Sequence, residues 1–168
     1  DRPATPAQVR RMRALIRQDL EQGAYGVSAG LDYAPARFAS LREVVRVVSV
    51  ARRWRTNFPN HERLTLETGL RSSKGIAETL AIGRRTGVVP VVTHMKVQGH
   101  EQGRAPRILG SLRAAAYAPA DVYPYLAGQT GLATLIIPTW AQDGGRAAML
   151  ERFQDRRQRR RIVTQAET

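Results

Sequence analysis

The sequence alternates helical segments with short strands rich in β-branched residues, and this alternation limits the fold more than any other feature. Helical periodicity follows capping signals at Thr5 and Ser40, and the clearest strand, residues 88–92, contains four valines. Four such β/α repeats predict a parallel sheet flanked by helices, because parallel strands need helical crossovers. Both a doubly wound sheet and an incomplete (β/α)8 barrel fit this α/β pattern. The 168 residues are too few for a whole barrel, which takes about 250.

The individual elements can be placed from caps, periodicity and turn residues. The predicted strands cover residues 25–30, 54–58, 88–92 and 121–125. The predicted helices share an apolar stripe and cover residues 6–22, 41–51, 75–85, 108–116 and 146–161. Residues 62–73 and 98–103 are predicted to be loops, and the apolar segment 132–140 is ambiguous. No low-complexity linker divides the chain, so residues 1–168 are predicted to form one domain.

The overall composition is that of a globular protein. Hydrophobic residues make up 42% of the chain, which suits a buried core and excludes wholesale disorder. No apolar run is long enough to cross a bilayer, and the charged residues after Asp1 predict no secretory signal. Cysteine is absent, which excludes disulfides and thiolate metal sites. We therefore expect a cytoplasmic protein with no membrane partner.

The chain is strongly basic, with a net charge of +13, and only two of its 27 basic residues are lysines. A charge this large raises the question of a nucleic-acid partner. The arginines, however, are spread over several helical segments, and the only dense run is at residues 156–161. We interpret the charge as a solvated surface, and nucleic acid is not the expected partner. The alternative is a non-catalytic basic α/β module that binds RNA or another subunit.

A histidine and a lysine follow the clearest predicted strand. His94 and Lys96 are two positions apart, and side chains alternate faces along a strand, so both should point the same way. His61 follows the preceding predicted strand, and in a parallel sheet the two histidines would meet at the carboxyl edge. Two imidazoles suit zinc, although a catalytic zinc site needs at least three protein ligands. The alternative is that each histidine only hydrogen-bonds a loop backbone.

Other side chains near these strand ends allow a functional and a purely structural interpretation. Lys96 could hold a substrate carboxylate as a point charge, or it could be solvated. Tyr123 and Tyr125 face the same way and could donate to a substrate carbonyl or simply pack. His100 lies in a polar loop and is expected at the surface. The patterns G-x-G-x-x-G and G-x-S-x-G are absent, which argues against nucleotide binding and serine-based acyl transfer.

Four segments taken together resemble the N-acyl-D-amino-acid deacylases, or D-aminoacylases, of the metal-dependent amidohydrolase superfamily. They are residues 23–33 (GAYGVSAGLDY), 57–61 (NFPNH), 93–96 (THMK) and 121–128 (DVYPYLAG). The resemblance covers nearly the whole chain, and the combination is more specific than any single string. It implies an incomplete (β/α)8 barrel, a Zn²⁺ cofactor, and hydrolysis of the amide bond of N-acyl-D-amino acids.

The resemblance also implies roles for individual residues. His94 is similar to the metal-binding histidine that ends the family's sixth barrel strand. Lys96 is similar to the lysine that grips the α-carboxylate of the substrate. Tyr123 resembles the tyrosine that contacts the substrate, and Tyr33 resembles the tyrosine of the family's Gly-Leu-x-Tyr string. Lys96, Tyr123 and Tyr33 are therefore the expected substrate-binding residues.

The histidine of the family's fifth strand has two candidate counterparts. Matching the threonine of the family string Thr-His-Met-Arg-Asn-Glu to Thr56 would place Asn57 on the ligand. Counting onward from Tyr33 without a gap reaches His61 instead. We favour His61, because imidazole is a far better zinc ligand than a carboxamide.

Two parts of the family's metal site have no counterpart in this sequence. They are the His-x-His pair of the first strand and the aspartate of the eighth strand, which is both ligand and proton shuttle. The resemblance therefore implies no catalytic residue within this chain, and impaired or absent activity for the chain alone. Exposed sheet edges of an incomplete barrel would also favour homo-oligomers.

Overall fold

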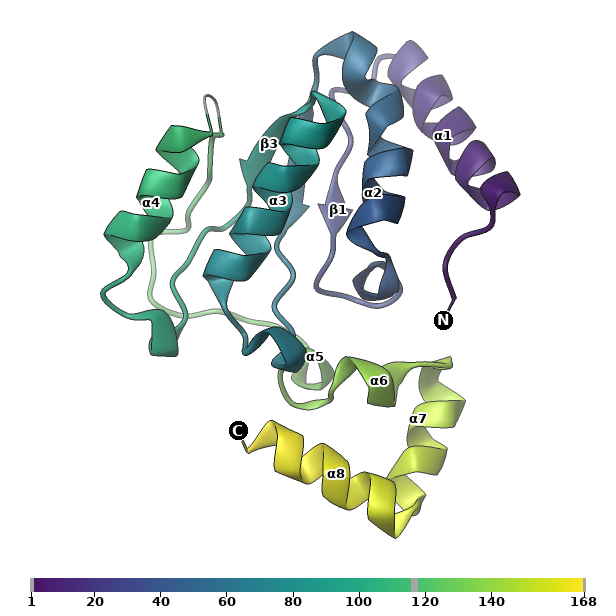
Figure 1. Cartoon of the computed structure of the whole chain (residues 1–168), viewed down its shortest axis with the longest axis vertical. Coiled ribbons are helices and arrows are strands. Elements are labelled where there is room, and N and C mark those ends of the chain that lie inside the picture. Colours follow the sequence, from purple (N-terminus) through teal and green to yellow (C-terminus); the bar gives the residue numbers. More distant parts are fainter. Residues whose placement is uncertain (1, 116–117, 168) are drawn as a thin grey trace.

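The computed structural model describes residues 2–115 and 118–167, which fold around a three-stranded parallel sheet. The strands are β1 (Ala29–Gly30), β2 (Asn57–His61) and β3 (Val89–Val92), in that spatial order (Figure 1). The helices are α1 (Pro6–Glu21), α2 (Leu41–Val48), α3 (Ser72–Thr86), α4 (Ala105–Ala114), α5 (Leu132–Ile136), α6 (Thr139–Gln142), α7 (Gly145–Gln154) and α8 (Arg156–Ala166). Short 3-10 helices are η1 (Ala36–Phe38), η2 (Ser49–Trp54), η3 (Leu66–Thr68) and η4 (Gly99–Glu101).

The helix boundaries follow from local sequence signals. The Thr5 hydroxyl accepts a hydrogen bond from the Gln8 backbone at the start of α1, and the Gln8 side chain accepts one from the Thr5 backbone. Ser40 caps α2 by accepting from the Glu43 backbone, whereas the Glu43 carboxylate accepts from Ala4 N instead of closing a capping box. Gly87 ends α3 with φ +77°, a left-handed conformation that glycine adopts without a steric penalty.

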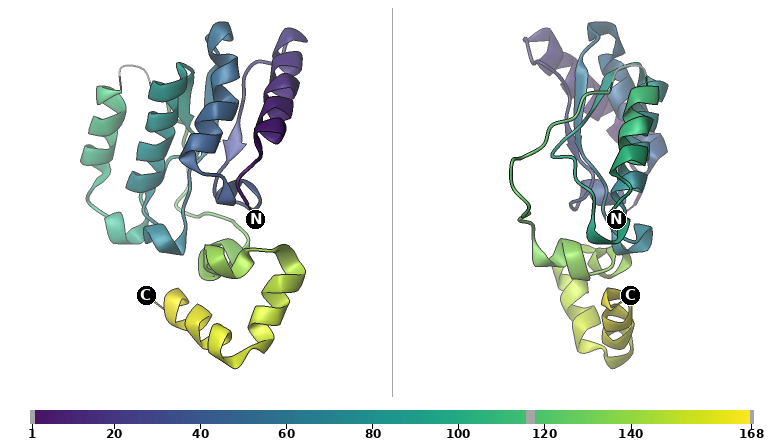
Figure 2. Two further views of the ribbon diagram at one scale, coloured as in Figure 1. Left: turned by 45° about the vertical axis from the view of Figure 1, so that its right-hand side comes forward. Right: turned by 90° about the vertical axis from the view of Figure 1, so that its left-hand side faces the viewer.

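The helices cover one face of the sheet. Phe58 on β2 and Val92 on β3 point into that side, where both are fully buried. Helix α3 lies very close to β3 at Gly83, where a Cβ atom would come within 2.5 Å of the Pro90 ring. Glycine, which has no Cβ, therefore allows this close approach. The second view in Figure 2 shows the helices on one side and the segment before α5 running past the other. On that other side, Val89 and Val91 help to line a pocket of about 500 Å³.

Several predicted elements differ in the structure. The strand predicted for residues 54–58 lies three residues later, at Asn57–His61, because η2 extends to Trp54, and only Ala29–Gly30 of the strand predicted for residues 25–30 is a strand. Residues 121–125 form no strand; only Ala120 pairs with Val92, in a single parallel bridge. The long helix predicted for residues 146–161 is two helices, because Asp155 leaves the helical conformation and caps α8 through the Gln158 backbone. The predicted end of another helix, Ala116, lies outside the described residues.

The carboxyl ends of the strands point toward the C-terminal helices. In Figure 1 the strand arrows run toward the part of the molecule that holds η3 and α5. Glu67 of η3 accepts hydrogen bonds from the backbone and the hydroxyl of Thr139 at the start of α6, at 2.7 and 2.9 Å. Among the described residues, no helix combines the length and the apolar character needed to cross a membrane.

Candidate functional site

The structure brings His61 and His94 together at the carboxyl edge of the sheet. His61 is the last residue of β2, and His94 follows β3 by two residues. Because β2 and β3 are parallel neighbours, their ends meet, and the two imidazole centroids lie 4.4 Å apart at an interplanar angle of 76°. Asn57, the rival candidate, is the first residue of β2, about 13 Å from His61 at the usual strand rise. It therefore lies at the opposite edge of the sheet.

Hydrogen bonds fix the tautomer of His61. Its Nδ1 lies 3.3 Å from the Glu62 carbonyl oxygen, which can only accept, so Nδ1 carries the proton. Nε2 is then an acceptor, and the Tyr33 hydroxyl donates to it at 2.9 Å. Burial lowers the pKa of the His61 imidazole from its usual value, which favours the neutral ring near pH 7. This tautomer, with Nδ1 held by a carbonyl and a lone pair on Nε2, is a common arrangement for metal-binding histidines.

The backbone of His94 has a left-handed conformation, with φ +37°. Sequence reasoning expected His94 and Lys96 to share a face through strand alternation, and that reason is wrong because β3 ends at Val92. The chain instead turns at His94, where the Asp121 carboxylate accepts from the His94 backbone N–H and the Asp121 carbonyl accepts from Met95 N at 2.8 Å. Asp121 therefore holds a backbone conformation that is costly for a residue other than glycine.

Lys96 nevertheless lies against His94. Its ammonium group donates to the His94 carbonyl oxygen at 3.0 Å and lies 3.2 Å from His94 Nδ1. An ammonium can only donate, so His94 Nδ1 is the acceptor and the ring proton is on Nε2. Burial, with the positive charge of Lys96, lowers the pKa of His94 from its usual value, so this imidazole is also neutral.

Three tyrosines extend the pair of imidazoles into a row of rings. Tyr33 meets His61 edge-on with centroids 4.8 Å apart, and its hydroxyl lies 3.2 Å from Thr130 Oγ1. On the other side, Tyr123 is stacked beside His94 at 6.4 Å, and Tyr125 is stacked on Tyr123 at 4.4 Å. The candidate metal ligands His61 and His94 and the candidate substrate-binding residues thus lie in one cluster. His100, in contrast, is exposed on η4. Their roles in binding stay predictions.

A buried carboxyl group next to His61 was missed by sequence reasoning. Glu62 is fully buried, and neither of its carboxyl oxygens has a hydrogen-bond partner among the described residues. Burial raises its pKa to about 7, although the charge of Lys96 acts in the opposite direction. The available signal was the alternation of Phe58, Asn60 and Glu62, which all point toward the helices, but residues 62–73 were predicted to be a loop.

The number of metal ligands in this cluster is limited. No group of three or more histidine, cysteine, aspartate or glutamate residues in the described part of the chain could hold a metal ion. Two neutral imidazoles suit a zinc ion by their chemistry, but a catalytic zinc site takes three protein ligands. The described residues therefore offer fewer ligands than such a site requires.

The contact between Asp121 and His94 can be tested in the isolated chain. We expect Asp121→Ala to release the His94 turn and to weaken the nuclear Overhauser effects between the His61 and His94 ring protons. Asp121→Asn should preserve these effects, because the amide keeps an acceptor oxygen. Asp155→Ala, which removes a helix cap elsewhere, is the matched control. Unchanged ring-to-ring effects in Asp121→Ala would show that Asp121 does not position His94.

Comparison with known proteins gives three related sequences from Alcaligenes xylosoxydans xylosoxydans; no family model matches the chain. A D-aminoacylase is 33% identical over 135 residues, which is 78% of this chain and 27% of that protein. An N-acyl-D-glutamate deacylase is 32% identical over 77% of this chain and 26% of its own length. An N-acyl-D-aspartate deacylase is 31% identical over 84% of this chain and 30% of its own length. The chain thus spans less than a third of each relative.

Solved structures agree with these sequence relationships. A D-aminoacylase described with a binuclear metal center matches with a TM-score of 0.70 and 30% identity, over 80% of this chain and 29% of that one. The N-acyl-D-glutamate deacylase of Bordetella bronchiseptica, complexed with zinc and a phosphonate inhibitor, matches with a TM-score of 0.67 and 32% identity. That match covers 74% of this chain and 27% of the deacylase chain.

Proposed function

This chain belongs to the D-aminoacylase family of amidohydrolases, and from that premise we propose that it is part of an enzyme that hydrolyses N-acyl-D-amino acids. The observation that carries the proposal is the meeting of two neutral imidazoles at the carboxyl edge of a parallel sheet, with an ammonium group beside them. That edge is where α/β barrels place their catalytic groups. The relatives named above are deacylases of small N-acyl amino acids, which makes such a compound the proposed substrate.

We assign residues 1–168 to part of a (β/α)8 barrel domain. Helices cover one face of the parallel sheet, as in the outer ring of a barrel, and Val89 and Val91 lie on the other face. A barrel interior is filled by side chains from all of its strands, so this face would pack against further strands. The same strand edges are the reason to expect association between copies of the isolated chain.

The proposed cofactor is a zinc ion bound by His61 and His94. Zinc would supply Lewis-acid polarisation of the amide carbonyl and a more acidic bound water. His61 would bind the ion through Nε2, whose lone pair accepts a hydrogen bond from the Tyr33 hydroxyl in the present structure. At least one further ligand must come from residues other than those described.

The remaining residues of the cluster would bind and orient the substrate. The Lys96 ammonium contacts the His94 imidazole and would pair with the α-carboxylate. The rings of Tyr33 and Tyr123 lie beside His61 and His94, respectively, and their hydroxyl groups would donate hydrogen bonds to the acyl amide. No carboxylate here is assigned a proton-transfer role, because Asp121 is engaged with the His94 backbone and Glu62 faces the helices.

Release of free amino acid from N-acetyl-D-amino acids tests the proposal directly. We expect the enzyme that contains this chain to hydrolyse the D-isomers, to lose activity on treatment with a chelator, and to regain it with Zn²⁺. N-acetyl-L-amino acids provide the matched control substrates. Equal rates with both isomers, or full activity in the metal-free protein, would overturn the proposed reaction.

Lys96 is expected to act mainly in substrate binding. We expect Lys96→Ala to raise KM by about 10- to 100-fold, because a charge-assisted hydrogen bond contributes about 1.5–3 kcal/mol, with a much smaller change in kcat. Lys74, the only other lysine, is exposed on α3, so Lys74→Ala is the matched control. Steady-state kinetics measure both. If the two variants have the same KM, Lys96 does not bind the carboxylate.

A further inference from the structure

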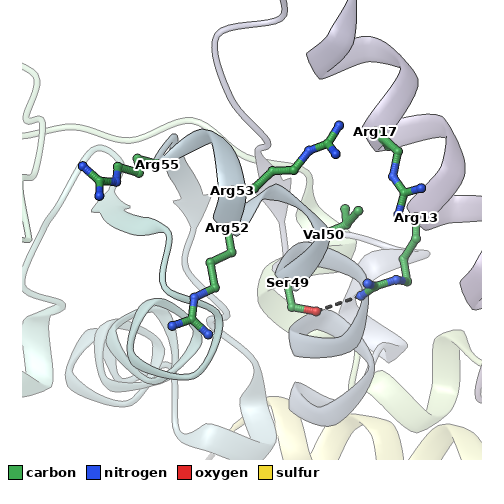
Figure 3. Close-up of a pocket in the computed structure, with 7 residues that line it drawn as sticks. All are labelled: Arg13, Arg17, Ser49, Val50, Arg52, Arg53 and Arg55. Carbon is green, nitrogen blue, oxygen red and sulfur yellow. Dashed lines mark hydrogen bonds between the residues drawn. The ribbon is translucent and has the colours of Figure 1, made fainter.

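Five arginines line a second site, which we call the arginine pocket. It has a volume of about 460 Å³ and is lined by Arg13, Arg17, Arg52, Arg53, Arg55 and Ser49, among others (Figure 3). Helix α1 contributes the first two arginines, and the segment from η2 to the start of β2 contributes the others. Among the residues that the structure describes, no acidic side chain lines the pocket.

The arginine pocket lies at the opposite end of the sheet from the histidines. Its residues at 49–55 lead directly into Asn57, the first residue of β2, whereas His61 is the last. The separation along β2 alone is about 13 Å at the usual strand rise. A ligand in this pocket therefore would not share contacts with the imidazoles, and its binding is a question separate from amide hydrolysis.

Several guanidinium groups of the arginine pocket have no counter-charge. Within the described part of the chain, the side chains of Arg17, Arg52 and Arg55 form no hydrogen bond or ion pair. Arg53 pairs with Glu21 across an exposed surface, where such a pair contributes little. The five positive charges, of which only Arg53 is paired among the described residues, create a positive potential, which a bound anion would neutralise.

Part of the arginine pocket is already ordered for binding. Arg13 donates to the Arg46 carbonyl oxygen and, at 2.8 Å, to Ser49 Oγ, so its guanidinium is fixed between α1 and η2. Figure 3 shows Arg53 extending from η2 toward Arg17 on α1, while Arg55 points away. Guanidinium groups on facing elements can therefore contact different oxygens of one ligand, and each offers a planar fork of donors.

We propose that the arginine pocket binds a compact polyphosphate group, as found in inorganic tripolyphosphate or a nucleoside di- or triphosphate. A single carboxylate would neutralise only one of the guanidinium groups, whereas neighbouring phosphates present several oxygens and charges. The arginines come from two neighbouring elements, α1 and the η2 segment, and this arrangement favours a compact anion over an extended strand. An RNA strand would instead need a continuous basic groove with stacking aromatics.

Isothermal titration calorimetry with inorganic tripolyphosphate and with ADP tests this binding. We expect Arg17→Gln/Arg53→Gln to weaken tripolyphosphate binding by at least about tenfold, since each charge-assisted contact contributes over a kilocalorie per mole. The matched control is Arg156→Gln/Arg157→Gln on α8, which removes the same charge from exposed positions outside the pocket. We expect its effect to stay below about threefold, because charges beyond a Debye length are screened.

A third variant should act in the opposite direction. Glu21→Gln removes the carboxylate that pairs with Arg53, so it should tighten tripolyphosphate binding. A misfolded variant would bind more weakly, so tighter binding cannot result from a loss of folding. Equal weakening by both arginine double variants, or no measurable binding by the unmodified chain, would overturn the proposal. Single-stranded RNA that binds through Arg17 and Arg53 when tripolyphosphate does not would also overturn it, in favour of a nucleic-acid surface.

Discussion

Replacing His61 by alanine should remove bound zinc from the proposed enzyme and lower its kcat/KM for N-acyl-D-amino acids by more than about a hundredfold. Residues that only support a metal ligand typically change affinity or activity by 10- to 100-fold, so loss of a ligand should cost more. The reason for choosing His61 is its tautomer, with Nδ1 bound to the Glu62 carbonyl and a lone pair on Nε2. Metal content after dialysis and steady-state kinetics provide the two measurements.

Two further variants distinguish this role from a general structural effect. His100→Ala replaces an exposed histidine on η4 and should leave metal content and kinetics unchanged. Asn57→Ala changes the rival ligand candidate at the other end of β2 and should also retain the metal. If Asn57→Ala loses zinc while His61→Ala keeps it, the assignment of the ligand is wrong.

The largest effect on stability is expected at a buried ion pair beneath the site. Asp32 Oδ1 accepts from Leu64 N at 2.9 Å and lies 3.5 Å from Arg37 Nη2, and both charged side chains are at most 5% exposed. Asp32→Ala would leave the Arg37 guanidinium buried without its carboxylate. Removing one partner of a buried pair typically costs about 3–5 kcal/mol, and we expect a loss of that size. Urea unfolding followed by circular dichroism measures it.

An exposed pair provides the matched control for Asp32. The side chains of Glu21 and Arg53 are 53% and 60% exposed, and Glu21→Ala should change the free energy of unfolding by less than about 1 kcal/mol. The double variant Asp32→Leu/Arg37→Met should be more stable than Asp32→Ala, because it removes the unpaired charge as well. Equal destabilisation by Asp32→Ala and Glu21→Ala would mean that the buried pair has no special energetic role.

Two helix starts were predictable because a side chain there accepts a hydrogen bond from a nearby backbone N–H. Thr5 and Ser40 mark the starts of α1 and α2 because their hydroxyls accept from backbone N–H groups three residues later. Asp155 is the same kind of signal, with Gln158 at the third position, and it divides the predicted last helix. The single helix was predicted from Met149, Leu150 and Phe153, which all precede Asp155, and residues 156–161 contain no apolar side chain that could mark a second helix. Local caps are therefore better guides than periodicity at such a junction.

The meeting of the two histidines was predictable, but the conformation around them was not. Parallel strands bring His61 and His94 to one edge whatever lies between them. The turn at His94 instead depends on Asp121, a residue 27 positions away whose carboxylate reaches the His94 backbone. Burial of Glu62 depends similarly on α3, where Gly75 lets the helix approach because it lacks a side chain. Such features depend on long-range packing and are absent from any short window of sequence.

The Lys96 ammonium donates a hydrogen bond to His94 Nδ1 and thereby occupies the lone pair of that nitrogen. While that contact persists, the proton on the imidazole stays on Nε2, the nitrogen farther from the backbone, so neither nitrogen has a free electron pair. Any anion that draws the ammonium away would release Nδ1 and allow the ring to change tautomer. Binding of an anion at Lys96 and availability of a lone pair on His94 are consequently linked. By thermodynamic reciprocity, a ligand that takes up the His94 lone pair would favour anion binding at Lys96 to the same degree.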